Sequence, residues 1–195
     1  MKIAIYNFKG GVGKTSIALN IALSAKDDYG VITNDFYSPI EKVLPPKSVI
    51  KLRPESKIPE IPDDYNIIYD FGGYIDQRSA DVLKSCDKVI IPTVNNMQEL
   101  QVTIEAIDKI ENHNKNIIII ANRLGKGDYE DVSKVIRKFY NNKYPILPLN
   151  NSKGLNKIFT QKKSVQKLAS ESGLNRYVYR NILPQLEKIN KIIFS

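Results

Sequence analysis

The hydrophobic positions of this chain form short apolar runs that alternate with longer amphipathic segments. The short runs are typical of strands buried in a sheet and lie at residues 3–6, 31–34, 65–70, 88–93, 116–121 and 144–149. The amphipathic segments predict helices at residues 17–23, 76–85, 96–112 and 128–141. This alternation predicts an α/β fold with a doubly wound, mostly parallel sheet and helices on both faces.

Two parts of the chain depart from the alternation. Residues 37–65 contain six prolines, which argue against a long helix there, although residues 49–52 have the composition of a short strand. The last part has a helical pattern with a break at Gly173 and a restart at Pro184, over residues 155–159, 165–170 and 174–193. We expect a single domain over residues 1–195 whose basic helical part is residues 151–195.

Composition narrows the class of protein. Hydrophobic residues make up 42% of the chain, which is typical of a globular protein. No apolar run approaches the roughly 20 residues of a membrane span. Cys86 is the only cysteine, so a disulfide framework or a paired-cysteine metal site is excluded. Because Met1 leads directly into the first strand, we expect no signal peptide and a cytoplasmic location.

The net charge of +8 is concentrated near the end of the chain. Residues 153–195 hold nine basic and two acidic residues, a net charge of +7. Such a surface is typical of a protein that binds a polyanion, although lysine-rich helix faces are also often simply solvated. The candidate DNA-binding residues are Lys153, Lys157, Lys162, Lys163, Lys167, Arg176 and Arg180.

The strongest chemical signal is the glycine-rich stretch between the first strand and the first helix, Phe8-Lys9-Gly10-Gly11-Val12-Gly13-Lys14-Thr15-Ser16. Glycines allow a tight turn that points several N–H groups at an anion, and the following helix N-terminus adds partial positive charge. In a phosphate-binding loop, Lys14 reaches the β- and γ-phosphates and the Thr15 hydroxyl binds Mg²⁺. The alternative is a glycine-rich turn without a ligand.

The loop departs from the usual pattern, because Phe8 stands where a glycine is expected and Lys9 adds a second lysine. In this it resembles the deviant Walker A loop of the ParA/MinD family of dimeric P-loop ATPases. The resemblance implies an ATP-dependent homodimer with ATP and Mg²⁺ as cofactors, in which Lys9 reaches the nucleotide of the other subunit. It also implies catalytic roles for Lys9, Lys14 and Asp35, and phosphate binding by residues 9–16: Lys9, Gly10, Gly11, Val12, Gly13, Lys14, Thr15 and Ser16.

Two carboxylates follow predicted strands. Asp35 matches the first position of the family's Asp-x-Asp-Pro motif, but Tyr37 stands at the second, where the family has an aspartate that orients the attacking water. A phenol is a poor base near neutral pH, so we expect slow hydrolysis. Asp70 resembles the Walker B carboxylate that binds the water shell of Mg²⁺, and an N–H of Gly72 or Gly73 is a candidate γ-phosphate sensor. Taken alone, a strand-end aspartate such as Asp70 is more typical of a residue that caps a turn, and the loop upstream is what favours the nucleotide role.

The adenine site is indicated less strongly. The apolar strand at residues 116–121 delivers Asn122 and Arg123 to the edge of the sheet where the loop lies. Family members often carry this pair, and an amide offers both a donor and an acceptor to a base. A strand-end asparagine in a turn is the alternative. In relatives the residues after the last strand flank the base, so Pro148, Leu149 and Asn150 are weaker candidates.

The function that the resemblance implies is plasmid or chromosome partition. It is closest to short ParA proteins without an N-terminal DNA-binding domain: the ATP-bound dimer binds DNA non-specifically, associates with the nucleoid, and a centromere-bound partner stimulates hydrolysis. One alternative is a MinD-like membrane-associated ATPase, since residues 182–194 have an apolar stripe flanked by Lys188 and Lys191. Another is an ATP-binding scaffold with negligible hydrolysis, which Tyr37 suggests. We expect the tail to pack on the domain, which makes membrane binding the less favoured reading.

Overall fold

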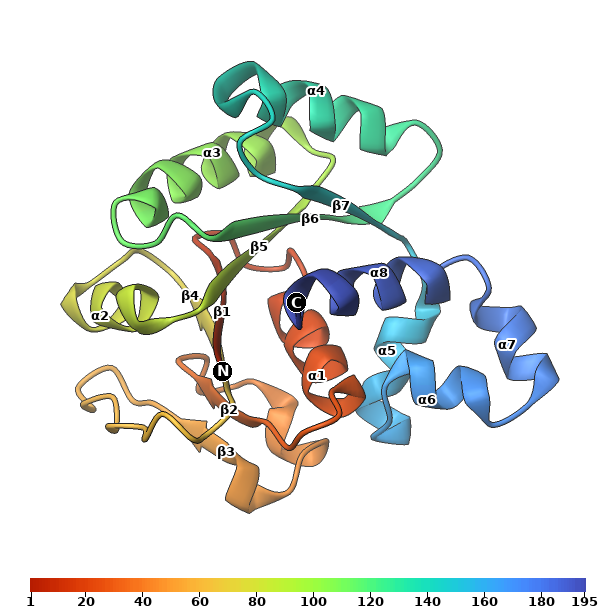
Figure 1. The fold of residues 1–195 in the computed structure, drawn as a ribbon, viewed down its shortest axis with the longest axis horizontal. Coiled ribbons are helices and arrows are strands. Elements are labelled where there is room, and N and C mark those ends of the chain that lie inside the picture. Colours follow the sequence, from red (N-terminus) through yellow and green to blue (C-terminus); the bar gives the residue numbers. More distant parts are fainter.

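The computed structural model describes residues 1–195 and contains one seven-stranded sheet in which every pair of neighbouring strands is parallel (Figure 1). The strand order is β3-β2-β4-β1-β5-β6-β7. The strands are β1 (Lys2–Asn7), β2 (Gly30–Thr33), β3 (Val49–Lys51), β4 (Ile67–Gly72), β5 (Lys88–Val94), β6 (Ile117–Leu124) and β7 (Ile146–Asn150). The α/β, doubly wound parallel fold predicted from the sequence is confirmed.

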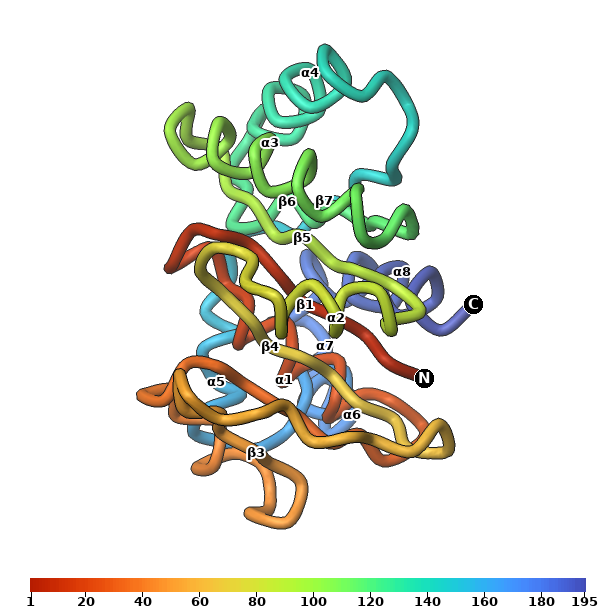
Figure 2. The backbone as a smooth tube through the Cα atoms, turned by 90° about the vertical axis from the view of Figure 1, so that its left-hand side faces the viewer, coloured from red at the N-terminus to blue at the C-terminus, as the bar shows by residue number.

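Helices cover both faces of this sheet (Figures 1 and 2). One face carries α1 (Lys14–Ser24), α5 (Lys153–Gln161), α6 (Val165–Ser170), α7 (Gly173–Tyr179) and α8 (Leu183–Ile193). The other carries α2 (Gln77–Ser85), α3 (Met97–Glu111) and α4 (Asp128–Tyr140). Two short 3-10 turns, Pro39–Lys42 and Pro46–Ser48, lie between β2 and β3.

The alternation of side chains in β1 divides the core into two layers. Ile3 and Ile5 pack with α1 and the C-terminal helices, whereas Ala4 and Tyr6 pack with α2 and α3. Strand β1 is central and buried on both faces. The chain continues from β1 to β2 on one side of β1, and from β4 to β5 on its other side. The carboxyl end of β1 therefore lies at the point where the direction of strand addition reverses. In open α/β sheets, ligands bind at this point.

Most predicted elements exist with small differences at their ends. Helix α1 begins at Lys14 rather than residue 17, because Gly13 adopts the left-handed conformation that precedes the helix. Strand β4 begins at Ile67, since residues 62–65 form a turn closed by the Tyr65 N–H and the Pro62 carbonyl. The helical region predicted at residues 174–193 is two helices, and Gly173 is already the first residue of α7.

The apolar stripe of the C-terminal tail is buried. Leu186, Ile189 and Ile193 of α8 pack into the core beside α1, and the ammonium group of Lys88 donates to the carbonyl of Ile192. Most of the stripe proposed for membrane contact is therefore covered by the domain itself, and only Phe194 at its end is exposed. Separately, none of the helices combines the length and the apolar character needed to cross a bilayer.

Candidate functional site

The loop between β1 and α1 surrounds a hollow of about 410 Å³ at the carboxyl edge of the sheet. Gly11 and Gly13 have φ angles of 79° and 96°, which favour glycine, and Gly13 directly precedes α1. The helix N-terminus carries no acidic side chain in its first turn and no side-chain cap, so its N–H groups and partial positive charge are available to an anion. The lining residues are Phe8, Gly10, Gly11, Gly13, Lys14, Thr15, Ser16, Asn34, Asp35, Asp70, Gly72, Gly73 and Arg123.

Two buried asparagines hold the loop at its two ends. The Asn7 amide donates to the Pro92 carbonyl at 2.8 Å, and its oxygen accepts from the Lys9 N–H at 2.9 Å. The Asn122 amide, at the end of β6, donates to the Val12 carbonyl at 2.8 Å. Leaving a buried amide without its hydrogen-bond partner costs about 1–3 kcal/mol of folding free energy, so both contacts hold the loop firmly.

The ammonium group of Lys14 lies inside the loop and donates to the Lys9 carbonyl at 2.8 Å. Burial lowers the pKa of Lys14, while attraction from Asp70 and Asp35 acts in the opposite direction. The hollow therefore has a cation whose solvation is poor and whose charge a phosphate would stabilise.

Thr15 and Asp70 form the candidate magnesium site. The Thr15 hydroxyl donates to Asp70 Oδ2 at 2.7 Å, and Asp70 is only 2% exposed. Burial raises the Asp70 pKa to about 6, although Thr15 and Lys14 oppose the change. The structure has no cluster of three or more His, Cys, Asp or Glu side chains. A hydroxyl with one or two carboxylates fits Mg²⁺, which usually keeps several waters and binds substrate phosphates.

We predict that Asp70→Asn changes stability in a pH-dependent way. The Asp70 pKa is higher in the folded chain, so the carboxyl favours folding when protonated, and this contribution is lost as pH rises from about 4 through about 6. The asparagine variant should therefore match the wild type near pH 4 and exceed it by on the order of 3 kcal/mol above pH 7 without nucleotide. Urea unfolding between pH 4 and 8 measures this, and a difference that does not vary with pH would contradict it.

Asp35 lines the hollow, whereas Tyr37 does not. Asp35 Oδ1 accepts the Tyr37 N–H at 3.1 Å, and the Tyr37 side chain is 93% exposed. The phenol therefore lies in solvent and has no contact that would aim it at a water in the hollow.

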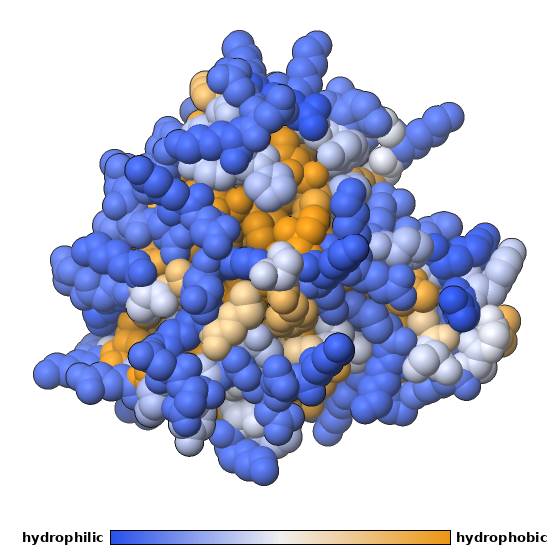
Figure 3. Space-filling model, viewed as in Figure 1, coloured by the Kyte–Doolittle hydropathy of each residue, from blue (hydrophilic) through white to orange (hydrophobic).

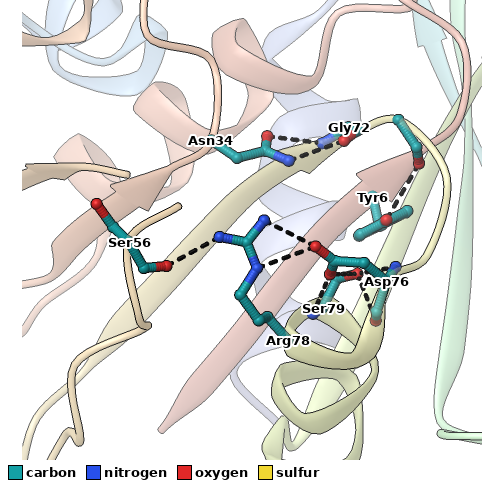
Figure 4. A network of polar contacts seen from close by, with 8 residues as sticks. Tyr6, Asn34, Ser56, Gly72, Asp76, Arg78 and Ser79 are labelled. Carbon is teal, nitrogen blue, oxygen red and sulfur yellow. Dashed lines mark hydrogen bonds and ion pairs between the residues drawn. The ribbon is translucent and has the colours of Figure 1, made fainter. Parts of the chain in front are cut away.

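The last residue of β4 and the segment after it are held by contacts that the sequence did not indicate (Figure 4). The Asn34 side chain accepts from the Gly72 N–H at 3.0 Å and donates to the Gly72 carbonyl at 2.8 Å. The Tyr6 hydroxyl donates to the Gly73 carbonyl, and Arg78 joins Asp76 to the Ser56 carbonyl. The N–H of Gly72, a predicted γ-phosphate sensor, thus has a protein partner in this structure.

A second hollow of about 280 Å³ adjoins the first and shares Gly13, Ser16 and Arg123 with it. Arg123 lines both hollows. Its backbone has a positive φ of 56° and lies at the register shift between β6 and β7. Asn122 also lines the second hollow, but both ends of its amide are engaged, by Val12 and by the Arg123 N–H. The remaining lining comes from the segment after β7: Asn150, Asn151, Ser152, Leu155 and Asn156.

Two of the three weaker adenine candidates do not reach this hollow. Leu149 is fully buried in the core with the C-terminal helices, and Pro148 is not among the lining residues. Asn150, the third of the weaker candidates, does line it. Asn151 was missed, although a polar residue directly after a buried strand is a signal that could have found it.

Lys9 points away from its own hollow. Its side chain is not among the lining residues, and its ammonium group lies 3.5 Å from Glu99 Oε1 on α3. The structure thus separates the two lysines of the loop, with Lys14 inside the hollow and Lys9 outside.

The candidate DNA-binding residues lie on α5, α6 and α7 or next to them, on the right of Figure 1, and the same part of Figure 3 is mostly hydrophilic. All of them are exposed except Lys163, which is half-buried and pairs with Glu171. The Arg180 guanidinium stacks on the exposed Tyr177 ring at 3.8 Å, and Lys157 lies over Tyr179 at 5.8 Å.

Comparison with known families gives one match over most of the chain. Residues 3–165 match the family described as the CobQ/CobB/MinD/ParA nucleotide binding domain. No individual curated protein matches the sequence.

The fold has been seen in several solved structures. Apo McdA from Cyanothece is 12% identical with a TM-score of 0.72, and the match covers 98% of each chain. A candidate plasmid partition protein from Borrelia burgdorferi B31, bound to AMPPNP, is 17% identical with a TM-score of 0.68, over 99% of this chain and 98% of that one. The cell division protein MinD from Aquifex aeolicus is 15% identical with a TM-score of 0.63, over 96% and 95%.

Proposed function

This chain belongs to the CobQ/CobB/MinD/ParA nucleotide-binding family, and from that premise we propose that it is a ParA-like ATPase of plasmid or chromosome partition. ATP joins two copies, and the dimer binds DNA without sequence preference. The observation that carries this proposal is the separation of the two lysines. Lys14 lies in the phosphate hollow, whereas the Lys9 side chain lies outside it, against Glu99, and is partly exposed and so accessible to a second copy.

ATP and Mg²⁺ are the proposed cofactors. The loop amides and Lys14 bind the phosphates, Thr15 and Asp70 hold the metal with its waters, and Asp35 contacts the water shell. The adjoining hollow, lined by Asn122, Arg123 and Asn150, receives the base. When bound, Mg²⁺ neutralises charge on the transferring phosphoryl group.

Hydrolysis is proposed to be slow in the absence of a partner. The chain offers Lys9 of a second copy and its own Lys14 to stabilise developing negative charge, but no side chain to orient the water at the position of Tyr37. A centromere-bound partner protein is proposed to supply or order the missing contact. An ATP-binding scaffold with negligible turnover is the limiting case of the same arrangement.

DNA is favoured over a membrane as the surface that the dimer binds. Leu186, Ile189 and Ile193 of α8 are buried in the core, so the helix does not present a continuous apolar face to lipid. The exposed lysines and arginines of residues 153–180 remain as a polyanion-binding surface, which also supports a nucleoid-associated location in the cytoplasm.

The test compares the oligomeric state with ADP and with a non-hydrolysable ATP analogue plus Mg²⁺, in the wild type and in Lys9→Ala. We expect dimers of the wild type only with the analogue, and monomers of the variant in both cases. The wild-type dimer should bind random-sequence DNA with an affinity that falls steeply as salt rises. A wild type that remains monomeric with the analogue, or a dimer that ignores DNA, would overturn the proposal.

A further inference from the structure

The backbone of Lys9 is fixed while its side chain is free to turn. Its N–H donates to Asn7 Oδ1 at 2.9 Å, and its carbonyl accepts from the Lys14 ammonium group at 2.8 Å. The side chain is 45% exposed and makes one ion pair, with Glu99. The Lys9 backbone is therefore held in place, while its long cationic side chain can adopt other rotamers. In the single subunit this side chain contacts α3 through Glu99.

Glu99 is well placed to hold a cation. It is the third residue of α3, after the capping residue Asn96, and the positive end of the helix dipole favours its negative charge. The Glu99 side chain is 20% exposed, and its second oxygen, Oε2, is buried without a hydrogen-bond partner. Lys9 is the only basic group in an ion pair with this carboxylate. Without Lys9, Glu99 would be a largely buried charge with no counterion.

We propose that Glu99 is a positioning residue that holds Lys9 in the separate subunit and competes with the second copy for it. The inference rests on the proposed function, in which Lys9 acts on the nucleotide of the other subunit. Each dimer must then break two Lys9–Glu99 pairs as it forms. Glu99 sets how readily the ATP-bound subunits associate, without touching the phosphates bound by its own subunit.

The expected change follows from the exposure of the pair. A partly exposed ion pair contributes modestly, about threefold in an equilibrium constant, and the dimer breaks two of them. Removing the charge of Glu99 should therefore strengthen the dimer by about tenfold, and this gain should shrink as salt screens the pair. A role of Glu99 in packing alone would produce no such dependence on salt.

The experiment measures the dimer dissociation constant of Glu99→Gln by analytical ultracentrifugation with a non-hydrolysable ATP analogue and Mg²⁺. Glu105→Gln is the matched control, because it removes the same charge from the exposed side of α3 and Glu105 forms no ion pair. We expect a tighter dimer only for Glu99→Gln, with ADP affinity equal to the wild type in both variants. Glu99→Ala should reproduce the effect.

The Lys9→Gln background isolates the pair. In the single subunit without nucleotide, a double-mutant cycle of urea unfolding with Lys9→Gln and Glu99→Gln should show a favourable coupling between the two side chains, and this coupling should shrink as salt rises. The inference fails if Glu99→Gln and Glu105→Gln behave alike in a wild-type loop, or if the cycle shows no coupling between Lys9 and Glu99. A wild type that does not dimerise with the analogue instead refutes the proposed function itself.

Discussion

Replacing Lys14 with alanine is expected to weaken ATP binding by about a hundredfold or more. Lys14 is the only lysine that lines the hollow, and Asp35 and Asp70 line it as well. Without the ammonium group, a triphosphate would lose the lysine that offsets its repulsion from these two carboxylates. Charge-assisted hydrogen bonds contribute about 1.5–3 kcal/mol each, and the lysine would make at least two of them to phosphate oxygens.

Calorimetric titration with ATP and Mg²⁺ measures the loss. Lys26→Ala is a suitable control, since it removes an exposed lysine in the loop after α1, outside the lining of both hollows. We expect the control to bind as the wild type does. An ATP affinity of Lys14→Ala within a few-fold of the wild type would mean that the hollow is not a phosphate site.

Gly13→Ala should have the largest effect on stability among the glycine substitutions of the loop. The Cβ would lie 2.3 Å from the Asn122 amide nitrogen, and the φ of 96° is unfavourable for any residue with a Cβ. Asn122 would have to move and lose its bond to Val12 in a buried place. The strain and the lost bond together amount to about 3 kcal/mol, which corresponds to a fall of about 10 °C in Tm.

Gly127→Ala separates the two causes of this loss. Gly127 has a φ of 88° and also precedes a helix, but a Cβ there meets no atom within 4 Å, so its alanine variant carries the backbone strain alone. Differential scanning calorimetry should therefore show a smaller fall in Tm for Gly127→Ala. In an Asn122→Ala background, Gly13→Ala should lower Tm by less than it does in the wild type. Equal effects of the two glycine variants would contradict a contact between residue 13 and Asn122.

The sequence predicted the parallel sheet because its strands are buried on both faces. The run Ile117–Ile118–Ile119–Ile120 leaves no polar residue to mark a solvent side, which is typical of a central parallel strand. The position of the glycine-rich loop between β1 and α1 was predictable for a related reason, since strand, glycines and helix are consecutive in the chain.

Contacts between distant segments were not predictable in the same way. The Asn34–Gly72 pair joins the residue after β2 to the end of β4, and the Lys9–Glu99 pair joins the loop after β1 to the first turn of α3. In both cases the proximity depends on the strand order. The expected position of Leu149 at the adenine site overlooked the alternation along β7, which turns this side chain into the core. Residues one or two places later, where the strand ends, line the hollow instead.

The two asparagines that fasten the loop have a consequence for its thermodynamics. Because Asn7 and Asn122 hold the backbone of the loop by their own hydrogen bonds, the loop would lose little conformational entropy on binding an anion. The free-energy cost of ordering the glycines is therefore not subtracted from the free energy of anion binding. The most flexible residue type in the chain thus forms a preorganised receptor, and its rigidity comes from amide side chains on two strands, β1 and β6.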